Sequence, residues 1–238
     1  MTTLLAGCGT DDEDASTSED PAAHSWTYED VDAWGETCAT GEEQSPVDLV
    51  DAVAETLTDP ELAYTTSAAT VVDNGHTVQT DLADAGTMTL DGETYTLRQF
   101  HFHTPSEHRV GGAAYAAEVH LVHEAADGAL AVLGVLVEEG AAHPVVDEVL
   151  GLAPEAGEEA VATTEPVDPQ ALLPDGRRTY RYPGSLTTPP CTEGVSWSVL
   201  EEPVTWSAEQ VAQLAERHPG SHRPPQPLGE RVLRHDTD

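Results

Sequence analysis

Two histidines separated by one residue are the strongest candidates for metal chemistry in this chain. Residues 99–103 read Gln-Phe-His-Phe-His. On a β-strand alternate side chains share a face, so Gln99, His101 and His103 would point one way while both phenylalanines pack on the other. The Cα atoms of the two histidines would lie about 6.5 Å apart, a spacing at which both rings can reach one ion. We therefore expect these two rings to bind the same metal ion.

A third histidine lies on a second alternating stretch, residues 117–123, where Glu118 and His120 share one face. If the two stretches are neighbouring antiparallel strands, three imidazoles meet, with Gln99 and Glu118 behind them. Three protein ligands, an open fourth position and outer acceptors that orient the rings are the pattern of a catalytic zinc site. We predict such a site, with Gln99 accepting the free N–H of His101 and Glu118 that of His120. The alternative is ordinary histidines on a polar strand face.

The spacing also fits one other kind of metal site. His101-x-His103-x-x-x-Glu107 is similar to the metal box of cupins, a β-barrel family that includes oxygenases and isomerases. In that interpretation Glu107 would be a fourth ligand, and a later Pro-x-Gly-x-x-His segment would supply the last histidine. No segment after Glu107 fits that pattern, so the cupin is disfavoured.

Short strands separated by turns must position these residues. Period-2 alternation bounded by turn residues predicts strands from about residue 64 onward. The stretches are 70–73, 76–82, 87–90, 95–103, 114–124, 130–138 and 195–200.

Only two helices are predicted. Residues 207–210 read Ser-Ala-Glu-Gln, a capping box ahead of an apolar stripe that Pro219 and Gly220 bring to an end. Pro144 opens the second helix, because proline is favoured at the first helical position. Residues 151–170 are acidic and read as loop. Since no repeat or shift in composition interrupts residues 24–238, we expect one mainly β (α+β) domain there.

The charge of the chain is strongly negative. Its 238 residues include 44 Asp and Glu and only nine basic residues, all of them arginine, which gives a net charge of −35. This balance argues against binding nucleic acid or anionic lipid, both of which need cationic side chains facing phosphate. Because such charge repels itself unless salt screens it, we hypothesise adaptation to high salt. The alternative is an acidic surface that only keeps the protein soluble.

The first 23 residues differ from the rest. Leu5-Ala6-Gly7-Cys8 resembles the lipobox at which bacterial lipoprotein precursors are cut and lipidated, although too few residues precede Cys8 for a complete secretory signal. Either an upstream start is missing or the match is chance. We interpret residues 1–23 as a truncated signal remnant followed by an acidic, disordered tether. Membrane attachment is expected only through lipid on Cys8.

Two further cysteines, Cys38 and Cys191, remain. In a reducing cytosol they would be free thiols, whereas in an exported protein two remaining cysteines usually form a bridge. The sequence alone does not place them close together.

Eight sequence blocks, in one order, resemble the alpha-class carbonic anhydrases of bacterial type over roughly residues 24–235. The resemblance implies zinc held by His101, His103 and His120 in a twisted, mostly antiparallel ten-stranded sheet with few short helices. It also implies a Cys38–Cys191 bridge and cis peptide bonds before Pro46 and Pro190. The blocks are residues 26–28, 34–35, 44–47, 74–78, 99–108, 118–123, 182–190 and 223–228.

The implied reaction is the reversible hydration of CO₂ to bicarbonate and a proton by a zinc-bound hydroxide. Thr187 would orient the hydroxide by accepting its proton in a hydrogen bond while donating its own to an ionised Glu107. His76 would carry the proton to solvent. The remaining implied residues form an apolar substrate pocket (Val122, Val132, Leu186, Thr188, Val195 and Trp197) and a path of waters (Tyr28, Asn74 and Gln79).

Three departures from the family pattern leave the ligands untouched. The segment between Tyr28 and Trp34 is shorter than usual, Asp73 stands where asparagine is commoner, and Ser221 occupies the position whose backbone carbonyl anchors the ring of His103. The chain is expected to be exported, to the cell envelope or beyond, as a monomer or homodimer. The alternative from another class is a carbonic-anhydrase-related binding module without turnover; such relatives lack one or more of the zinc histidines, which are all present here.

Overall fold

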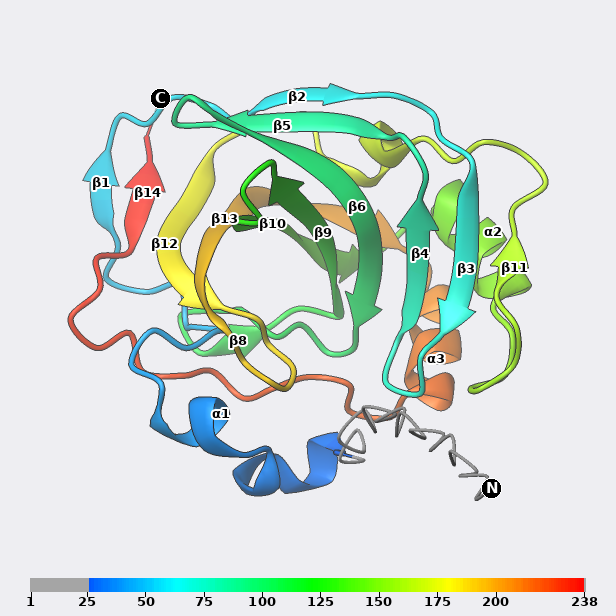
Figure 1. The fold of residues 1–238 in the computed structure, drawn as a ribbon, viewed down its shortest axis with the longest axis horizontal. Coiled ribbons are helices and arrows are strands. Elements are labelled where there is room, and N and C mark those ends of the chain that lie inside the picture. Colours follow the sequence, from blue (N-terminus) through cyan, green and yellow to red (C-terminus); the bar gives the residue numbers. More distant parts are fainter. Residues whose placement is uncertain (1–25, 238) are drawn as a thin grey trace, which may run out of the picture.

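The computed structural model describes residues 26–237, and the N-terminal segment that contains Cys8 lies outside them. The architecture is one large twisted sheet with short helices at its periphery (Figure 1). The helices are η1 Tyr28–Ala33, α1 Glu36–Thr40, α2 Pro144–Leu152, η2 Pro169–Leu172 and α3 Ala208–Arg217. The strands are β1 Val53–Glu55, β2 Glu61–Tyr64, β3 Ala69–Asp73, β4 Val78–Leu82, β5 Gly86–Leu90, β6 Glu93–His103, β7 Arg109–Val110, β8 Ala113–Ala114, β9 Ala117–Ala125, β10 Leu130–Glu139, β11 Val161–Ala162, β12 Thr179–Ser185, β13 Glu193–Trp206 and β14 Arg234–Asp236.

The sheet confirms the predicted mainly β fold. Ten strands follow one path, β1-β14-β12-β13-β10-β9-β6-β4-β3-β11, and β2 and β5 attach beside β6 to make twelve. In the described part, the pairs β1–β14 and β10–β13 are parallel and all other pairs are antiparallel. No helix among residues 26–237 is long and apolar enough to cross a membrane.

The two faces of β6 lead to different environments. Phe100 and Phe102 are fully buried in the main core, which also contains apolar side chains of α2 and α3. These two helices lie near each other on one side of the sheet, next to β3 and β4 (Figure 1). Because side chains alternate along a strand, His101 and His103 face the opposite side from the two phenylalanines. The alternation expected from residues 99–103 is therefore confirmed.

Both predicted helices form for the expected reasons. Ser207 accepts the backbone N–H of Gln210, and Gln210 returns a contact to the backbone N–H of Ser207, so the capping box is complete at the start of α3. Pro144 occupies the first turn of α2. The expected loop over residues 151–170 also contains the short strand β11 and the start of η2, which no sequence pattern indicated.

Two buried arginines connect separate segments of the chain through backbone carbonyls. Arg223, which is 2% exposed, donates to the carbonyl oxygens of Cys38 and Ser45. Arg231, which is 8% exposed, donates to those of Gln44 and Pro183, among others. The two guanidinium groups thus supply donors to carbonyl oxygens of α1, of β12 and of the segment at residues 44–45 that lies between them in sequence.

Candidate metal centre

Three histidine side chains meet on the face of the sheet opposite the main core. His101 of β6 is the register partner of His120 of β9, and His103 is the partner of Glu118. One nitrogen from each of His101, His103 and His120 lies within 4.8 Å of the other two. The ring centroids are 4.5 to 5.2 Å apart. The antiparallel pairing expected from the sequence thus brings the three rings together.

The outer nitrogen of each ring is held by a fixed partner. His101 Nδ1 lies 2.8 Å from Gln99 Oε1, and His120 Nε2 lies 3.0 Å from Glu118 Oε1, as predicted. His103 Nδ1 lies 2.7 Å from the carbonyl oxygen of Ser221, so the serine supplies the backbone anchor. The nitrogens left to face one another are Nε2 of His101, Nε2 of His103 and Nδ1 of His120.

The donor set fits a zinc ion. His103 Nε2 is buried and has no hydrogen-bond partner among the described residues, an arrangement that a bound cation would satisfy. Burial lowers the pKa of His103 to about 4 and lowers that of His120 below its usual value. Burial, followed by the two neighbouring rings, holds the pKa of His101 well below its usual range. All three rings are therefore neutral at pH 7, the form that binds metal.

Glu118 organises the ring of His120 from behind. Its Oε1 also accepts from His108 Nδ1 at 2.7 Å, and its Oε2 accepts the backbone N–H groups of Glu107 and His108. Burial raises the pKa of Glu118, but His108 and His120 outweigh it and hold that pKa well below the usual range. A glycine provides the space for this carboxylate: a Cβ on Gly134 would lie 3.0 Å from Glu118 Oε1. Glu118 is thus an ionised acceptor in a closely packed site.

Glu107 lies beside the three rings but outside their ligand group. Its Oε1 accepts the backbone N–H of Arg223 at 2.8 Å and lies 3.6 Å from His103 Nδ1, the nitrogen that Ser221 anchors. Burial raises the pKa of Glu107 to about 7, opposed by His120 and by hydrogen bonds from Arg223 and the Thr187 side chain. The arrangement differs from a cupin, in which this glutamate would join the histidines on the metal.

A cavity of about 210 Å³ lies in front of the histidines. One wall is apolar, formed by Val122, Val132, Leu186 and Trp197, and Thr187 and Thr188 border it. Val195 does not line the cavity. It is 2% exposed and packs in the same core cluster as Trp197, so its expected place in the substrate pocket is not what the structure shows. Val195 and Trp197 share one face of β13, and of the two only the larger indole reaches the cavity.

The polar side of the cavity carries His76 and its neighbours Tyr28, Asn74 and Gln79. The ring of His76 is stacked on Trp26, with centroids 3.6 Å apart and 11° between the planes. Burial lowers the pKa of His76, His218 lowers it further and Asp73 raises it. Burial also raises the pKa of Tyr28, which therefore keeps its hydroxyl proton.

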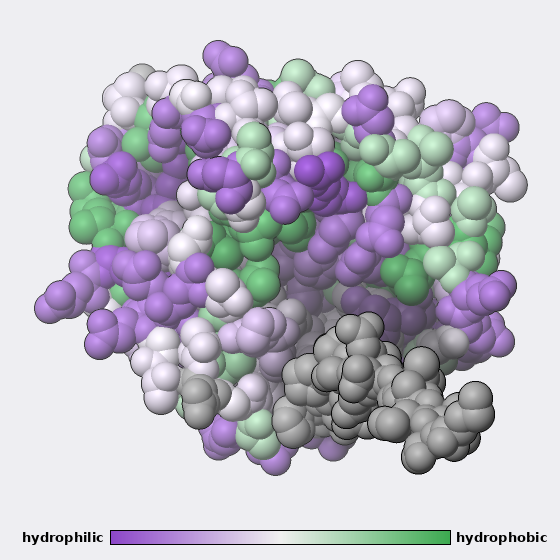
Figure 2. All heavy atoms as spheres, viewed as in Figure 1, coloured by the Kyte–Doolittle hydropathy of each residue, from purple (hydrophilic) through white to green (hydrophobic). Residues whose placement is uncertain are grey.

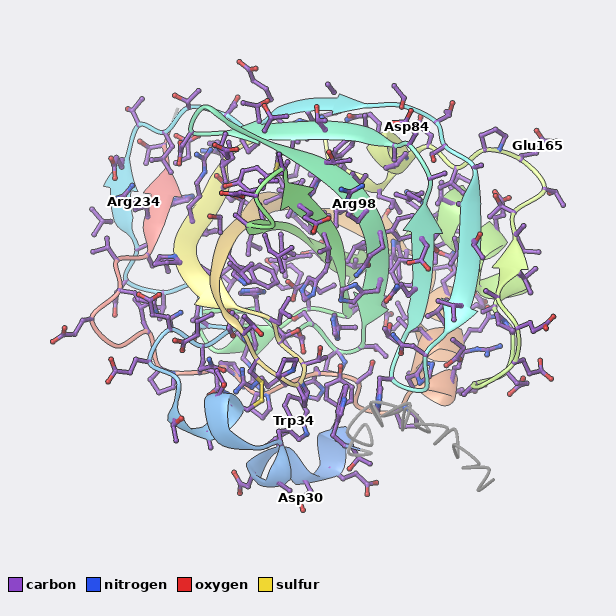
Figure 3. All side chains as sticks on the ribbon, viewed as in Figure 1. Asp30, Trp34, Asp84, Arg98, Glu165 and Arg234 are labelled. Carbon is purple, nitrogen blue, oxygen red and sulfur yellow. A yellow bond between two sulfur atoms is a disulfide. The ribbon has the colours of Figure 1, made fainter. Side chains whose placement is uncertain are left out.

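The disulfide expected from the resemblance is present. Cys38 and Cys191 are joined by an S–S bond of 2.06 Å, with their Cα atoms 5.1 Å apart. Trp34 packs against the bridge, which is the yellow bond beside its label in Figure 3. Because Cys191 lies four residues after Thr187, the bridge ties the threonine loop to the N-terminal helices. The cis bonds expected at Ser45–Pro46 and Pro189–Pro190 are present, and Thr104–Pro105 is a third.

Several residues near the site were not indicated by the sequence. The backbone N–H of Arg223 donates to Glu107. Trp26 stacks on His76; the sequence block of residues 26–28 contains Trp26 but did not indicate this contact. Asp73, Arg217 and His218 form a cluster around a buried carboxylate behind the His76 turn. Backbone contacts and pairings between distant segments leave no local pattern in the sequence, so no signal pointed to these contacts.

Comparison with known proteins places the whole described part in one family. Residues 24–237 match the family described as eukaryotic-type carbonic anhydrase. A carbonic anhydrase of Pectobacterium carotovorum is 41% identical over 220 residues, covering 88% of this chain and 90% of that protein. The sulfanilamide complex of the alpha-carbonic anhydrase from Thermovibrio ammonificans is 42% identical, with a TM-score of 0.80 and coverage of 83% of this chain and 88% of that one. A hyperthermostable carbonic anhydrase from a hydrothermal vent chimney is 36% identical, with a TM-score of 0.87 and coverage of 90% and 100%. With this sheet, this histidine cluster and these similarities, the chain belongs to the alpha-class carbonic anhydrases.

Proposed function

We propose that the chain catalyses the reversible hydration of CO₂ to bicarbonate and a proton, with zinc held by His101, His103 and His120. The observation that carries the proposal is that three neutral rings face one point of a cavity whose other wall is apolar. Zinc bound there would keep its double positive charge and acidify a coordinated water to a pKa of about 7, the value known for carbonic anhydrases as a class.

Thr187 and Glu107 would orient the attacking oxygen. The Thr187 side chain helps to lower the pKa of Glu107, and in this proposal its hydroxyl would donate to the carboxylate. Its oxygen lone pairs are then left to accept a hydrogen bond from the nucleophile. An ionised carboxylate only accepts, so this arrangement fixes the direction of both hydrogen bonds. The apolar wall of Val122, Val132 and Trp197 would hold CO₂ beside that oxygen.

His76 would take the proton to solvent. An imidazole has an unperturbed pKa of about 6.5, close to working pH, which suits a group that must accept and release a proton in each cycle. His76 borders the same cavity as the three metal-site rings, together with Tyr28, Asn74 and Gln79, whose polar groups would hold the intervening waters.

The test measures zinc and activity on the full chain. We expect the purified protein to bind zinc and to hydrate CO₂ in stopped-flow measurements, with inhibition by a sulfonamide. Zinc without hydration would favour a binding module. His76→Ala should lower kcat in dilute buffer by about tenfold or more and recover with added imidazole; an unchanged kcat would reassign the shuttle.

We also infer that the protein is exported, to the cell envelope or beyond. The Cys38–Cys191 bridge supports this, because structural disulfides persist in oxidising compartments. Lipid on Cys8 would provide the attachment, and the protein would act as a monomer or homodimer on a small-molecule substrate. Metabolic labelling with a palmitate analogue, compared between the natural chain and Cys8→Ala, tests the anchor.

A further inference from the structure

A cluster of three side chains around a buried carboxylate joins the end of β3 to the end of α3. The side chain of Asp73 is 1% exposed. Its Oδ2 lies 3.1 Å from Arg217 Nη1 and 3.0 Å from His218 Nε2. Burying a carboxylate is costly unless it is paired and hydrogen-bonded, and both partners of Asp73 come from one helix terminus. None of the roles proposed above uses this cluster.

The cluster lies directly behind the turn that carries His76. Asp73 Oδ1 accepts the backbone N–H of Gly75 at 2.9 Å, and Asn74 Oδ1 accepts the backbone N–H of His76 at 3.0 Å. At the other end of the turn, the Thr77 hydroxyl hydrogen-bonds to the backbone of Phe102, between the two histidines of β6. The turn is therefore fastened to α3 at one end and to the metal-site strand at the other.

The segment after α3 also holds the metal centre. Ser221 anchors His103 through its carbonyl oxygen, and the backbone N–H of Arg223 donates to Glu107. Both residues lie within a few positions of His218. One short stretch of chain thus contacts the His76 turn, one metal-site ring and the glutamate beside Thr187, so the position of each is set relative to the others.

We propose that the Asp73–Arg217–His218 cluster is a positioning device for proton transfer, fixing the His76 turn at the mouth of the cavity relative to the three metal-site rings. The inference rests on the proposed shuttle role of His76. Asp73, Arg217 and His218 are positioning residues, because they act through His76 and not on the substrate.

The charges of the cluster act on His76 in opposite directions. The groups packed around its ring are Trp26 and Tyr28, with Asp73 from β3 and His218, the residue after α3, behind the turn. After burial, which lowers the pKa of His76, His218 lowers it and Asp73 raises it. If the two substitutions only loosened the turn, they would not change the pKa of His76 in opposite directions. The direction of the pKa change in each variant therefore distinguishes an electrostatic contact with His76 from a general loosening of the structure.

The experiment compares Asp73→Asn and His218→Gln in the zinc-loaded full chain. The measurements are kcat in dilute buffer, kcat/KM, zinc content and the NMR titration of His76. We expect kcat to fall about threefold to tenfold, since small misplacement of a relay group costs up to about a hundredfold, while kcat/KM and zinc content stay at the natural values. Imidazole should restore kcat. The pKa of His76 should fall in Asp73→Asn and rise in His218→Gln.

Controls make the outcome decisive. His235 is also paired with a carboxylate, 3.3 Å from Glu201 at a distant part of the sheet, and His235→Gln should change none of these quantities. In a His76→Ala background both cluster variants should have no further effect on kcat.

If His76→Ala slows turnover but the cluster variants do not, or if both variants move the pKa of His76 the same way, the inference is wrong. If His76→Ala itself has no effect, the shuttle role fails and this inference fails with it. Should Asp73→Asn not fold, His218→Gln retains the Asp73–Arg217 pair and still tests the proposal.

Discussion

His101 and His120 face each other directly across the antiparallel strands β6 and β9, with ring centroids 5.2 Å apart and planes at 88°. Rings in this orientation direct their inner nitrogens to a shared point. The first prediction is that His120→Ala loses most of its zinc and its CO₂ hydration, because two protein nitrogens hold zinc far more weakly than three. Metal analysis after dialysis checks this.

The matched control lies three residues away. His123 is on the opposite face of β9, buried, with its Nε2 2.7 Å from the Tyr64 hydroxyl. His123→Ala should lower stability, because it leaves a cavity, but should retain zinc. Equal zinc loss in both variants would contradict the proposed ligand set.

Gly134→Ala provides a test of the outer layer of the site. The added Cβ would lie 3.0 Å from Glu118 Oε1 and 3.3 Å from Val199, so the carboxylate that contacts His120 must shift from its present position. Loss of an outer-shell partner typically weakens metal binding by about 10–100-fold. A competition titration with a chromogenic chelator measures the affinity. Gly151→Ala is the control, since no atom lies within 4 Å of a Cβ there, and it should leave zinc affinity unchanged.

The raised pKa of Glu107 predicts how the stability of the zinc-free protein depends on pH. Burial raises that pKa from 4.5 to about 7, so between these values the folded chain binds more protons than the unfolded chain. The contribution of Glu107 to stability therefore falls as pH rises through this window, by about 2–3 kcal/mol between pH 5 and pH 8. Denaturant unfolding of the zinc-free protein and of Glu107→Gln should show this fall only in the natural chain.

Two further comparisons sharpen that experiment. Glu165→Gln, at an exposed loop position, should leave the pH dependence as it is (Figure 3). Bound zinc should weaken the dependence, because a nearby positive ion favours the carboxylate. A parallel pH dependence in the natural chain and Glu107→Gln would show that another group is responsible. In activity, Glu107→Gln should lower kcat/KM by about a hundredfold or more, the usual loss when one preorganised hydrogen-bonding group is removed.

Opening the disulfide should cost both stability and activity. The bridge joins residues 153 positions apart, and closing so long a loop restricts the unfolded chain. We expect Cys38→Ser to lower the free energy of unfolding by about 2–5 kcal/mol and to lower kcat, because the Thr187 loop loses its attachment. Unfolding under oxidising and reducing conditions measures this. Reductant should lower the stability of the natural chain but not of the Cys38→Ser, Cys191→Ser double variant.

Salt should stabilise this protein. Hydrophilic residues are distributed around the face shown in Figure 2, and the chain has 44 acidic residues against nine arginines. At 1 M salt the Debye length falls to about 3 Å, so repulsion between surface carboxylates is screened. We expect Tm to rise with KCl, by about 2–4 °C for each kcal/mol gained. A Tm that does not change between 0.1 and 2 M KCl would leave only solubility as the reason for the acidity.

Period-2 alternation was sufficient to predict which side chains of β6 and β9 share a face, and the meeting of the three rings also required the two strands to be neighbours. The faces of β6 and β9 follow from residues 99–103 and 117–123, and the capping box predicts α3. The sequence did not predict the contacts between distant segments. Asp73 meets Arg217 across 144 positions of sequence, and Arg223 holds Glu107 through a backbone N–H that any non-proline residue would offer. Such contacts depend on the tertiary fold, so they become visible only in the structure.

The carbonyl contacts of Arg223 and Arg231 bear on the chain's lack of lysine. Each guanidinium reaches two or more carbonyl oxygens from separate segments of the chain at once, which a single compact ammonium group would not span. Two of the nine arginines therefore hold separate segments of the fold together. Replacing either guanidinium would leave several buried carbonyl oxygens without a donor, so a redesign of the protein's charge should leave these two positions unchanged.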